Sequence, residues 1–142
     1  MSEPLATFRR KIGEAMWARL AARLAELNRD IATRGIKPYR NQCDLVTGYS
    51  YGEFYDWDLY FENLYLSYYG IARYCRSNLE AFLDNQLECG FVARTLINPR
   101  WRQHFKPFLA QIALLGSRQT GEFRWLAGKY YERLRKYLDY WF

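Results

Sequence analysis

Apolar residues recur every three or four positions along much of the chain, which is the spacing of one face of a helix. The pattern is clearest near the N-terminus, where it predicts one long helix from about Glu3 to Thr33, stopped by Gly35 and Pro38. Residues 36–56 have no helical period and carry turn residues, so we expect a long ordered loop there. The apolar stripe of the long helix consists of Leu5, Phe8, Ile12, Met16, Leu20, Leu24, Leu27 and Ile31.

Two further helices are predicted in the middle of the chain. One begins near Asp56 to Asp58, because carboxylates suit the positive end of a helix dipole, and runs through Tyr74. The next opens at residues 77–80, whose sequence Ser-Asn-Leu-Glu is a capping box, and ends at Gly90.

The last two predicted helices follow an irregular stretch at 91–106. Pro107 suits the first turn of a helix that ends near Gly116, and Thr120 is expected to cap a final helix. No strand alternation is found, so the predicted class is all-α. The final helix ends on two apolar rings, 141–142, without a stop signal, and we expect further chain to cover them.

Length and charge narrow the possible functions. The 142 residues suit one domain. The net charge of +6 is unevenly distributed along the chain. Residues 1–40 carry nine basic and four acidic residues, residues 41–92 carry two basic and eight acidic residues, and residues 93–142 carry ten basic and three acidic residues. A nucleic-acid binder gathers its basic and aromatic residues on one surface, but here the aromatic-rich segment is the acidic one. We therefore expect no nucleic-acid partner, and interpret the basic flanks as solvated helix faces.

The cysteines and the N-terminus indicate the compartment. Cys43, Cys75 and Cys89 have no CxxC spacing, and His104 is the one histidine, so we expect neither disulfides nor a zinc site. We expect instead that the cysteines are small buried or half-buried thiols in a reducing compartment. The chain lacks a signal-peptide core and a run of about 18 apolar residues. We expect a cytoplasmic protein without a membrane partner.

The segment from Tyr49 to Tyr69 interleaves aromatic rings with carboxylates, which is the chemistry of a sugar-binding surface. A pyranose packs its C–H face on an aromatic ring and donates its hydroxyls to carboxylates. The alternative is an aromatic helical core with acids on its solvent side. The candidate acceptors are Glu53, Asp56, Asp58 and Glu62, and the candidate platforms are Tyr51, Phe54, Tyr55 and Trp57.

The chain lacks the motifs of serine hydrolases, zinc hydrolases and nucleotide-binding enzymes. His104 can orient a substrate group or simply lie at the surface. Asp56 and Asp58 are two apart at a helix start and point away from each other, so they make a poor acid/base pair. Asp58 is therefore interpreted as a ligand for sugar hydroxyls.

Three motifs in order resemble the first part of the catalytic domain of six-hairpin glycosidases. They are Tyr-Asp-Trp-Asp-Leu-Tyr-Phe-Glu at 55–62, Phe-Leu-Asp-Asn-Gln-Leu-Glu-Cys-Gly-Phe-Val-Ala-Arg-Thr-Leu at 82–96 and His-Phe-Lys-Pro-Phe-Leu-Ala-Gln at 104–111. The similar groups are glycoside hydrolase family 63, with processing α-glucosidase and mannosylglycerate hydrolase-like enzymes, and the related trehalases. The resemblance implies an (α/α)6 toroid, here incomplete with about five helices, in which residues 1–40 form a leading helix and turn and residues 41–142 the first hairpins.

The resemblance also implies roles for particular residues. Trp57 would flank the sugar and Asp58 would accept its hydroxyl hydrogens, with Phe54 and Tyr55 lining the same pocket. Lys106 and Gln111 would lie on the facing loop and helix; the alternative for both is a helix start and a solvated face. Phe108 stands where the family has the second proline of a turn.

The family's catalytic acid and base lie in later segments, so neither is expected in this chain. The expected function is therefore that of an N-terminal fragment of an inverting glycosidase that cleaves terminal α-glucosyl or mannosyl units from small saccharides, with no cofactor. The alternative is a stand-alone helical carbohydrate-binding or interaction module without catalysis.

Overall fold

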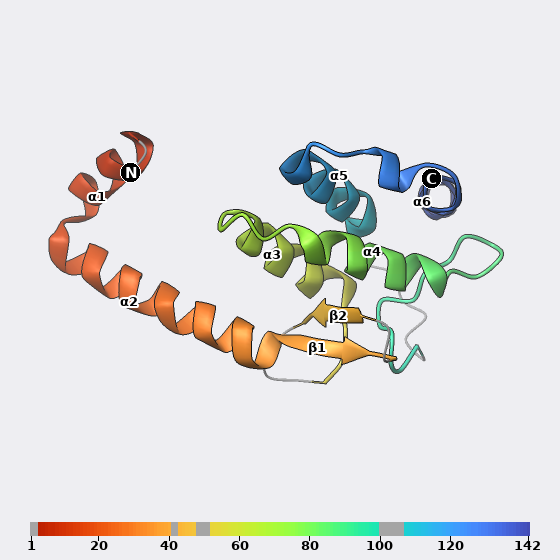
Figure 1. Ribbon diagram of the computed structural model, residues 1–142, viewed down its shortest axis with the longest axis horizontal. Coiled ribbons are helices and arrows are strands. Elements are labelled where there is room, and N and C mark those ends of the chain that lie inside the picture. Colours follow the sequence, from red (N-terminus) through yellow and green to blue (C-terminus); the bar gives the residue numbers. More distant parts are fainter. Residues whose placement is uncertain (1–2, 41–42, 48–51, 100–106) are drawn as a thin grey trace.

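A computed structural model describes residues 3–40, 43–47, 52–99 and 107–142. Within these ranges the chain forms six α-helices and one β-hairpin (Figure 1). The all-α prediction therefore holds apart from the hairpin, and the toroid stays a prediction. In the described part, no helix combines the length and the apolar character that crossing a membrane requires.

The N-terminal helices form an arm that extends from the body of the molecule (Figure 1). The single helix predicted there is wrong, because α1 (Glu3–Ile12) and α2 (Glu14–Asp30) are separated at Gly13, whose φ of 77° is outside the helical range. No residue of α2 is buried. The arm meets the body near its base, where the Tyr65 hydroxyl donates to Asn28 Oδ1 at 2.8 Å.

A β-hairpin occupies the first part of the predicted loop, which corrects that prediction. After one wide helical turn (Ile31–Gly35), β1 (Ile36–Tyr39) pairs antiparallel with β2 (Cys43–Val46), from Ile36 opposite Val46 to Tyr39 opposite Cys43. Pro38 is tolerated because each strand of a two-stranded sheet is an edge. The hairpin also joins residues on both sides of the predicted division at residue 40.

The boundary between the two central helices differs from the prediction. Helix α3 (Asp56–Ser67) begins where expected but ends early, and α4 (Arg73–Asp84) already includes the predicted capping box. The break lies at Gly70, with φ of 75°. Asn78 is buried within α4, where its Oδ1 accepts a hydrogen bond from the Val46 backbone N–H at 3.2 Å, so its role is tertiary.

The C-terminal helices are shifted along the chain relative to the prediction. Helix α5 (Phe108–Thr120) follows Pro107 as expected, but passes Gly116 and ends before Gly121, whose φ is 69°. Thr120 does not cap the last helix, because its hydroxyl donates back to the Gly116 carbonyl at 2.9 Å. A short 3-10 turn (Arg124–Leu126) then leads to α6 (Lys129–Trp141).

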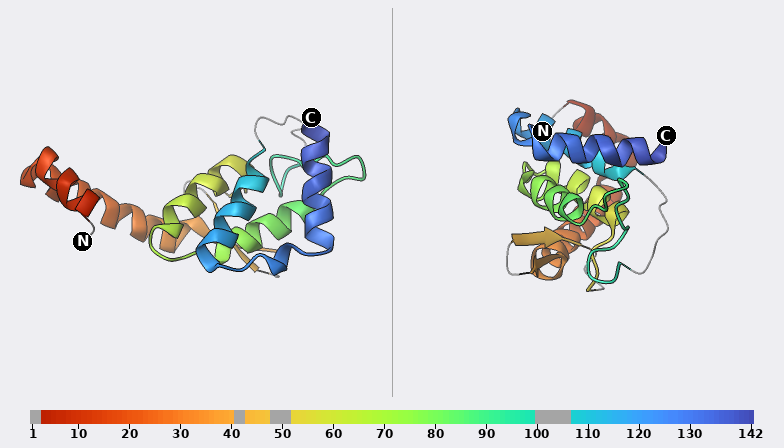
Figure 2. Two further views of the ribbon diagram at one scale, coloured as in Figure 1. Left: turned by 90° about the horizontal axis from the view of Figure 1, so that it is seen from above. Right: turned by 90° about the vertical axis from the view of Figure 1, so that its right-hand side faces the viewer.

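The core lies where α3, α4 and α5 pack together, with β2 against α3 and α4. Helix α3 packs beside α5, α4 packs against both, and α6 lies across α4 and α5. The arm and α6 lie at opposite ends of the long axis (Figure 2). The fully buried core residues include Leu45, Leu59, Leu79, Phe82, Leu83, Leu109 and Ile112.

The two cysteines whose side chains are described are free and differ in exposure. Cys75 is buried on α4, and burial raises the pKa of its thiol to about 11. Its Cβ lies against Gly116, where an added methyl group would approach it to 2.7 Å. Cys89 is exposed, so the prediction of buried or half-buried thiols holds for Cys75 and is wrong for Cys89.

Candidate functional site at the start of helix α3

The start of α3 is held against the irregular segment 91–99. Tyr55, the extended residue before the helix, forms an isolated antiparallel bridge with Thr95. The Asp56 backbone N–H donates to the Arg94 carbonyl at 3.0 Å. Two segments about 40 residues apart in sequence are thereby fixed side by side, and both contribute side chains to one cluster.

Glu53 binds the two segments together. One carboxylate oxygen accepts the backbone N–H groups of Phe54 at 2.8 Å, Leu96 at 3.2 Å and Ile97 at 2.9 Å, and the other accepts that of Asn98 at 2.9 Å. Charge-assisted bonds to backbone donors are among the stronger hydrogen bonds in proteins. Glu53, predicted as an acceptor for sugar hydroxyls, thus holds the backbone instead.

Arg94 brings a guanidinium group to the predicted aromatic residues. Its Cζ lies 5.3 Å from the ring centroid of Tyr55 and 5.3 Å from that of Trp57, within the range of cation–π attraction. Arg94 belongs to the second motif of the family resemblance, but it was not predicted as a site residue. Only the fold brings it beside residues 55–57, so spacing along the sequence could not have identified this contact.

Asp56 is the buried carboxyl group of this cluster. Burial raises its pKa to about 6, with the nearby Asp58 adding to the rise, while the Trp57 N–H and the charge of Arg94 oppose it. The Trp57 N–H donates to Asp56 Oδ1 at 2.8 Å. Helix α6 closes the cluster with Tyr137, whose phenol pKa is raised by burial and by the charge of Asp56.

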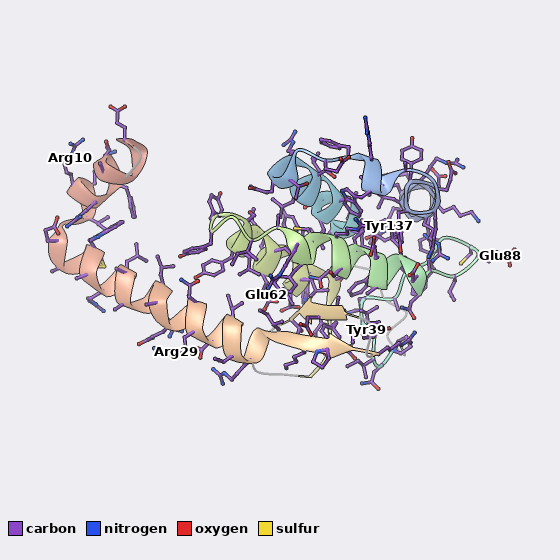
Figure 3. The ribbon with its side chains drawn as sticks, viewed as in Figure 1. Arg10, Arg29, Tyr39, Glu62, Glu88 and Tyr137 are labelled. Carbon is purple, nitrogen blue, oxygen red and sulfur yellow. The ribbon has the colours of Figure 1, made fainter. Side chains whose placement is uncertain are left out.

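Glu62 lies one helical turn after Asp58, on the side of α3 toward the hairpin (Figure 3). Burial raises the pKa of Glu62 to about 8, with a further contribution from Asp58, and Lys37 of β1 opposes the rise. Among the described residues, its buried Oε2 has no hydrogen-bond partner. A carboxyl group with this pKa is mostly protonated at neutral pH, so it can donate a hydrogen bond rather than act as a base.

The structure places the predicted site residues in different environments. Tyr55, Trp57 and Asp58 lie together at the start of α3, each partly exposed. Phe54 is 1% exposed and packs edge-on against Tyr39 at 5.7 Å, so in this structure it belongs to the core, which was the alternative interpretation of the aromatic residues. Gln111 is exposed in the first turn of α5, and Lys106 lies outside the described residues.

Two other residues considered in the sequence, Tyr51 and His104, also lie outside the described residues. In the described part of the chain, no group of three or more His, Cys, Asp or Glu side chains is arranged to hold a metal ion.

Four hollows of about 310, 240, 460 and 400 Å³ in the described part of the molecule are each lined by residues other than Tyr55, Trp57 and Arg94. The chemistry present at the start of α3 is specific: two aromatic rings, a guanidinium group and two carboxyl groups, of which Asp56 has a pKa raised by burial. This set can hold a polyhydroxylated ring, but it offers no opposed acid and base for bond cleavage.

Comparison of the chain with protein-family models, with curated proteins and with solved structures gave no match in any of the three. The assignment of a function therefore depends on the residues and geometry of the chain itself.

Proposed function

We propose that this chain supplies part of the sugar-binding wall of an inverting α-glycosidase. The observation that carries the proposal is the position of the Arg94 guanidinium at 5.3 Å from both the Tyr55 and Trp57 rings, beside the carboxyl groups at the start of α3. Guanidinium groups donate to sugar oxygens, carboxylates accept from sugar hydroxyls, and an indole face packs on the C–H face of a pyranose.

In this proposal the residues have separate tasks. Trp57 packs against the ring of a terminal glucose-like or mannose-like unit, and Asp58 accepts its hydroxyl hydrogens. Arg94 holds the two aromatic rings in place and donates to a ring substituent. Hydroxyl contacts that strengthen as positive charge develops on the sugar lower the barrier to cleavage, which binding the ground state alone does not.

The catalytic acid and base are proposed to come from segments outside this chain, as the family resemblance implies. An inverting enzyme needs two carboxyl groups far enough apart to admit a water molecule. Asp56 and Asp58 do not suit that task, because they are two residues apart on one helix and Asp56 is 8% exposed.

The packing of the described helices is compatible with the proposed toroid. Helix α3 lies beside α5, with α4 between them in sequence and packed on both, as in two successive helical hairpins. Continuing such hairpins around a ring would complete an (α/α)6 architecture, with helix starts such as that of α3 facing the substrate.

The test uses the complete native gene product and small α-glucosides and α-mannosides. We expect hydrolysis that first releases the β-anomer, observed by ¹H NMR, and a fall in kcat/KM of about tenfold or more for Asp58→Asn. Asp139→Asn, at an exposed position of α6, is the matched control and should leave kcat/KM unchanged. No hydrolysis of either glycoside, or unchanged kinetics for Asp58→Asn, would contradict the proposal.

A stand-alone carbohydrate-binding module is the second candidate, favoured by the chain's own buried core of residues from α3, α4 and α5. The mass of the native product separates the candidates. A product several times heavier than 17.1 kDa supports the glycosidase, and a product of 17.1 kDa supports the module.

A further inference from the structure

Two adjoining hollows lie at the tip of the β-hairpin, and neither is lined by Tyr55, Trp57, Asp58 or Arg94. They measure about 310 and 460 Å³ and share Arg40 and Asn85 in their walls. Polar residues of α4 line the first, and the loop that follows α4 lines the second. In Figure 1 the end of β1 lies below the C-terminal half of α4. Arg40, the residue that follows β1, lines both hollows.

Arg40 has an unusual backbone conformation and, among the described residues, no carboxylate partner. Its φ is 49°, in the left-handed region where Gly or Asn fits a hairpin turn with less strain. Its guanidinium lies 5.0 Å over the ring of Tyr39, and among the described residues it forms no ion pair with a carboxylate. The turn geometry therefore does not explain why a long cationic side chain stands at this position.

The carboxylates that line the polar hollow are already neutralised. Glu80 pairs with Arg76 at 2.8 Å. Asp84 pairs with Lys129 at 2.5 Å and with Arg133 at 3.4 Å. Each carboxylate that lines the hollow therefore already has a cationic partner, and among the described residues neither of them pairs with the Arg40 guanidinium.

The second hollow supplies an apolar wall next to that charge. Leu87 and Ile97 are 57% and 51% exposed, and Phe91, Leu96 and Pro99 line the same hollow. Covering these side chains with an alkyl group would remove apolar surface from water. The complementary ligand is therefore a molecule with an anionic head and an apolar body.

We propose that this double hollow binds small amphiphilic carboxylates, with the carboxylate on the Arg40 guanidinium and the alkyl chain along Leu87 and Ile97. The guanidinium can donate two parallel hydrogen bonds to a carboxylate. Since none of these residues belongs to the sugar site proposed above, the two proposals stand or fall separately.

The experiment is calorimetric titration of the 142-residue chain with octanoate below its micelle concentration. We expect saturable binding of one octanoate per chain, at least about tenfold weaker in Arg40→Asn, because a charge-assisted bond is lost. Asn adopts the left-handed backbone readily, so this variant should keep the fold, which circular dichroism checks. Arg29→Gln, which removes an exposed charge from α2, should bind octanoate like the wild type.

Further measurements test the contributions of the polar hollow and the apolar hollow separately. Acetate lacks the alkyl chain and octanol lacks the charge, so each should bind more weakly than octanoate. Leu87→Asp, at an exposed position, should also weaken octanoate binding and decides the matter if Arg40→Asn does not fold. The absence of saturable octanoate binding, or equal losses in Arg40→Asn and Arg29→Gln, would overturn the proposal.

Discussion

At the scale of single residues, two carboxyl groups of α3 have pKa values above those of exposed acids. Burial raises the pKa of Asp56 to about 6 and that of Glu62 to about 8. In the unfolded chain both groups titrate near pH 4. The folded state therefore binds more protons than the unfolded state between pH 4 and pH 8, and its stability should fall as the pH rises through that range.

Glu62→Gln should remove the part of this pH dependence that lies above pH 6. Glutamine keeps the size of the side chain and carries no charge, so at pH 8 the variant should be more stable than the wild type by about 1–3 kcal/mol. At pH 5, where Glu62 is already protonated in the folded state, the difference should be smaller. Urea unfolding of the wild type and the variant at pH 5 and pH 8 measures the two differences in stability.

Asp56→Asn provides the comparison, because its effect on the free energy of unfolding should reach its full size by about pH 6 and stay constant at higher pH. An equal gain in stability for Glu62→Gln at pH 5 and pH 8 would show that Glu62 is ionised in the folded protein throughout.

At the scale of elements, glycines with positive φ decide where helices end and where segments touch. Gly90 has φ of 96°, and a Cβ there would lie 2.4 Å from the Lys136 carbonyl oxygen of α6. Gly121, at the end of α5, has φ of 69° and open space around it. Both positions therefore require a positive φ, but only Gly90 lies in close contact with α6.

Gly90→Ala should destabilise the protein by about 3 kcal/mol or more, since both the backbone and α6 must shift. Gly121→Ala should cost about 1 kcal/mol, from the left-handed backbone alone. Thermal or urea unfolding of both variants tests the packing of α6 on the loop after α4. Equal losses in the two variants would contradict this packing.

Local sequence predicted some of these elements and not others. The starts of α3 and α5 were predictable, because Asp56 and Pro107 act within the first turn of their own helix. The hairpin was not, because Lys37 and Pro38 obscure its alternation and its pairing depends on a partner strand. The breaks at Gly13 and Gly70 depend on positive φ values that an uninterrupted apolar pattern does not reveal.

The candidate site shows the same division. Tyr55, Trp57 and Asp58 are neighbours in sequence and were predicted together. The contact of Arg94 with Trp57 and the hydrogen bonds from the backbone N–H groups of residues 96–98 to Glu53 depend on tertiary structure. Phe54 could not be assigned to the core by residue type, since an aromatic ring serves either purpose.

At the scale of the whole molecule, a compact body carries an exposed helical arm. The body contains the buried core, whereas α2 has no buried residue. Phe8 and Met16 on the arm are 45% and 51% exposed. Local opening of the arm therefore costs little burial, and opening of α4 disrupts the core.

Hydrogen exchange should reveal this difference. Amides of α2 between Met16 and Leu24 should exchange at least about 100-fold faster than those of α4 between Leu79 and Leu83. Amides near Asn28, where Tyr65 anchors the arm, should be intermediate. Equal protection of α2 and α4 would mean that the arm is packed against a surface in solution.

The most direct test of the proposed sugar site is saturation-transfer difference NMR on the complete native gene product with methyl α-glucoside and methyl α-mannoside. The wild type should transfer saturation to the ring C–H protons of at least one glycoside, Trp57→Ala should abolish the transfer, and Trp17→Ala, on the arm, should preserve it. If neither glycoside receives saturation from the wild type, or if Trp57→Ala leaves the transfer intact, the start of α3 is not a sugar-binding site.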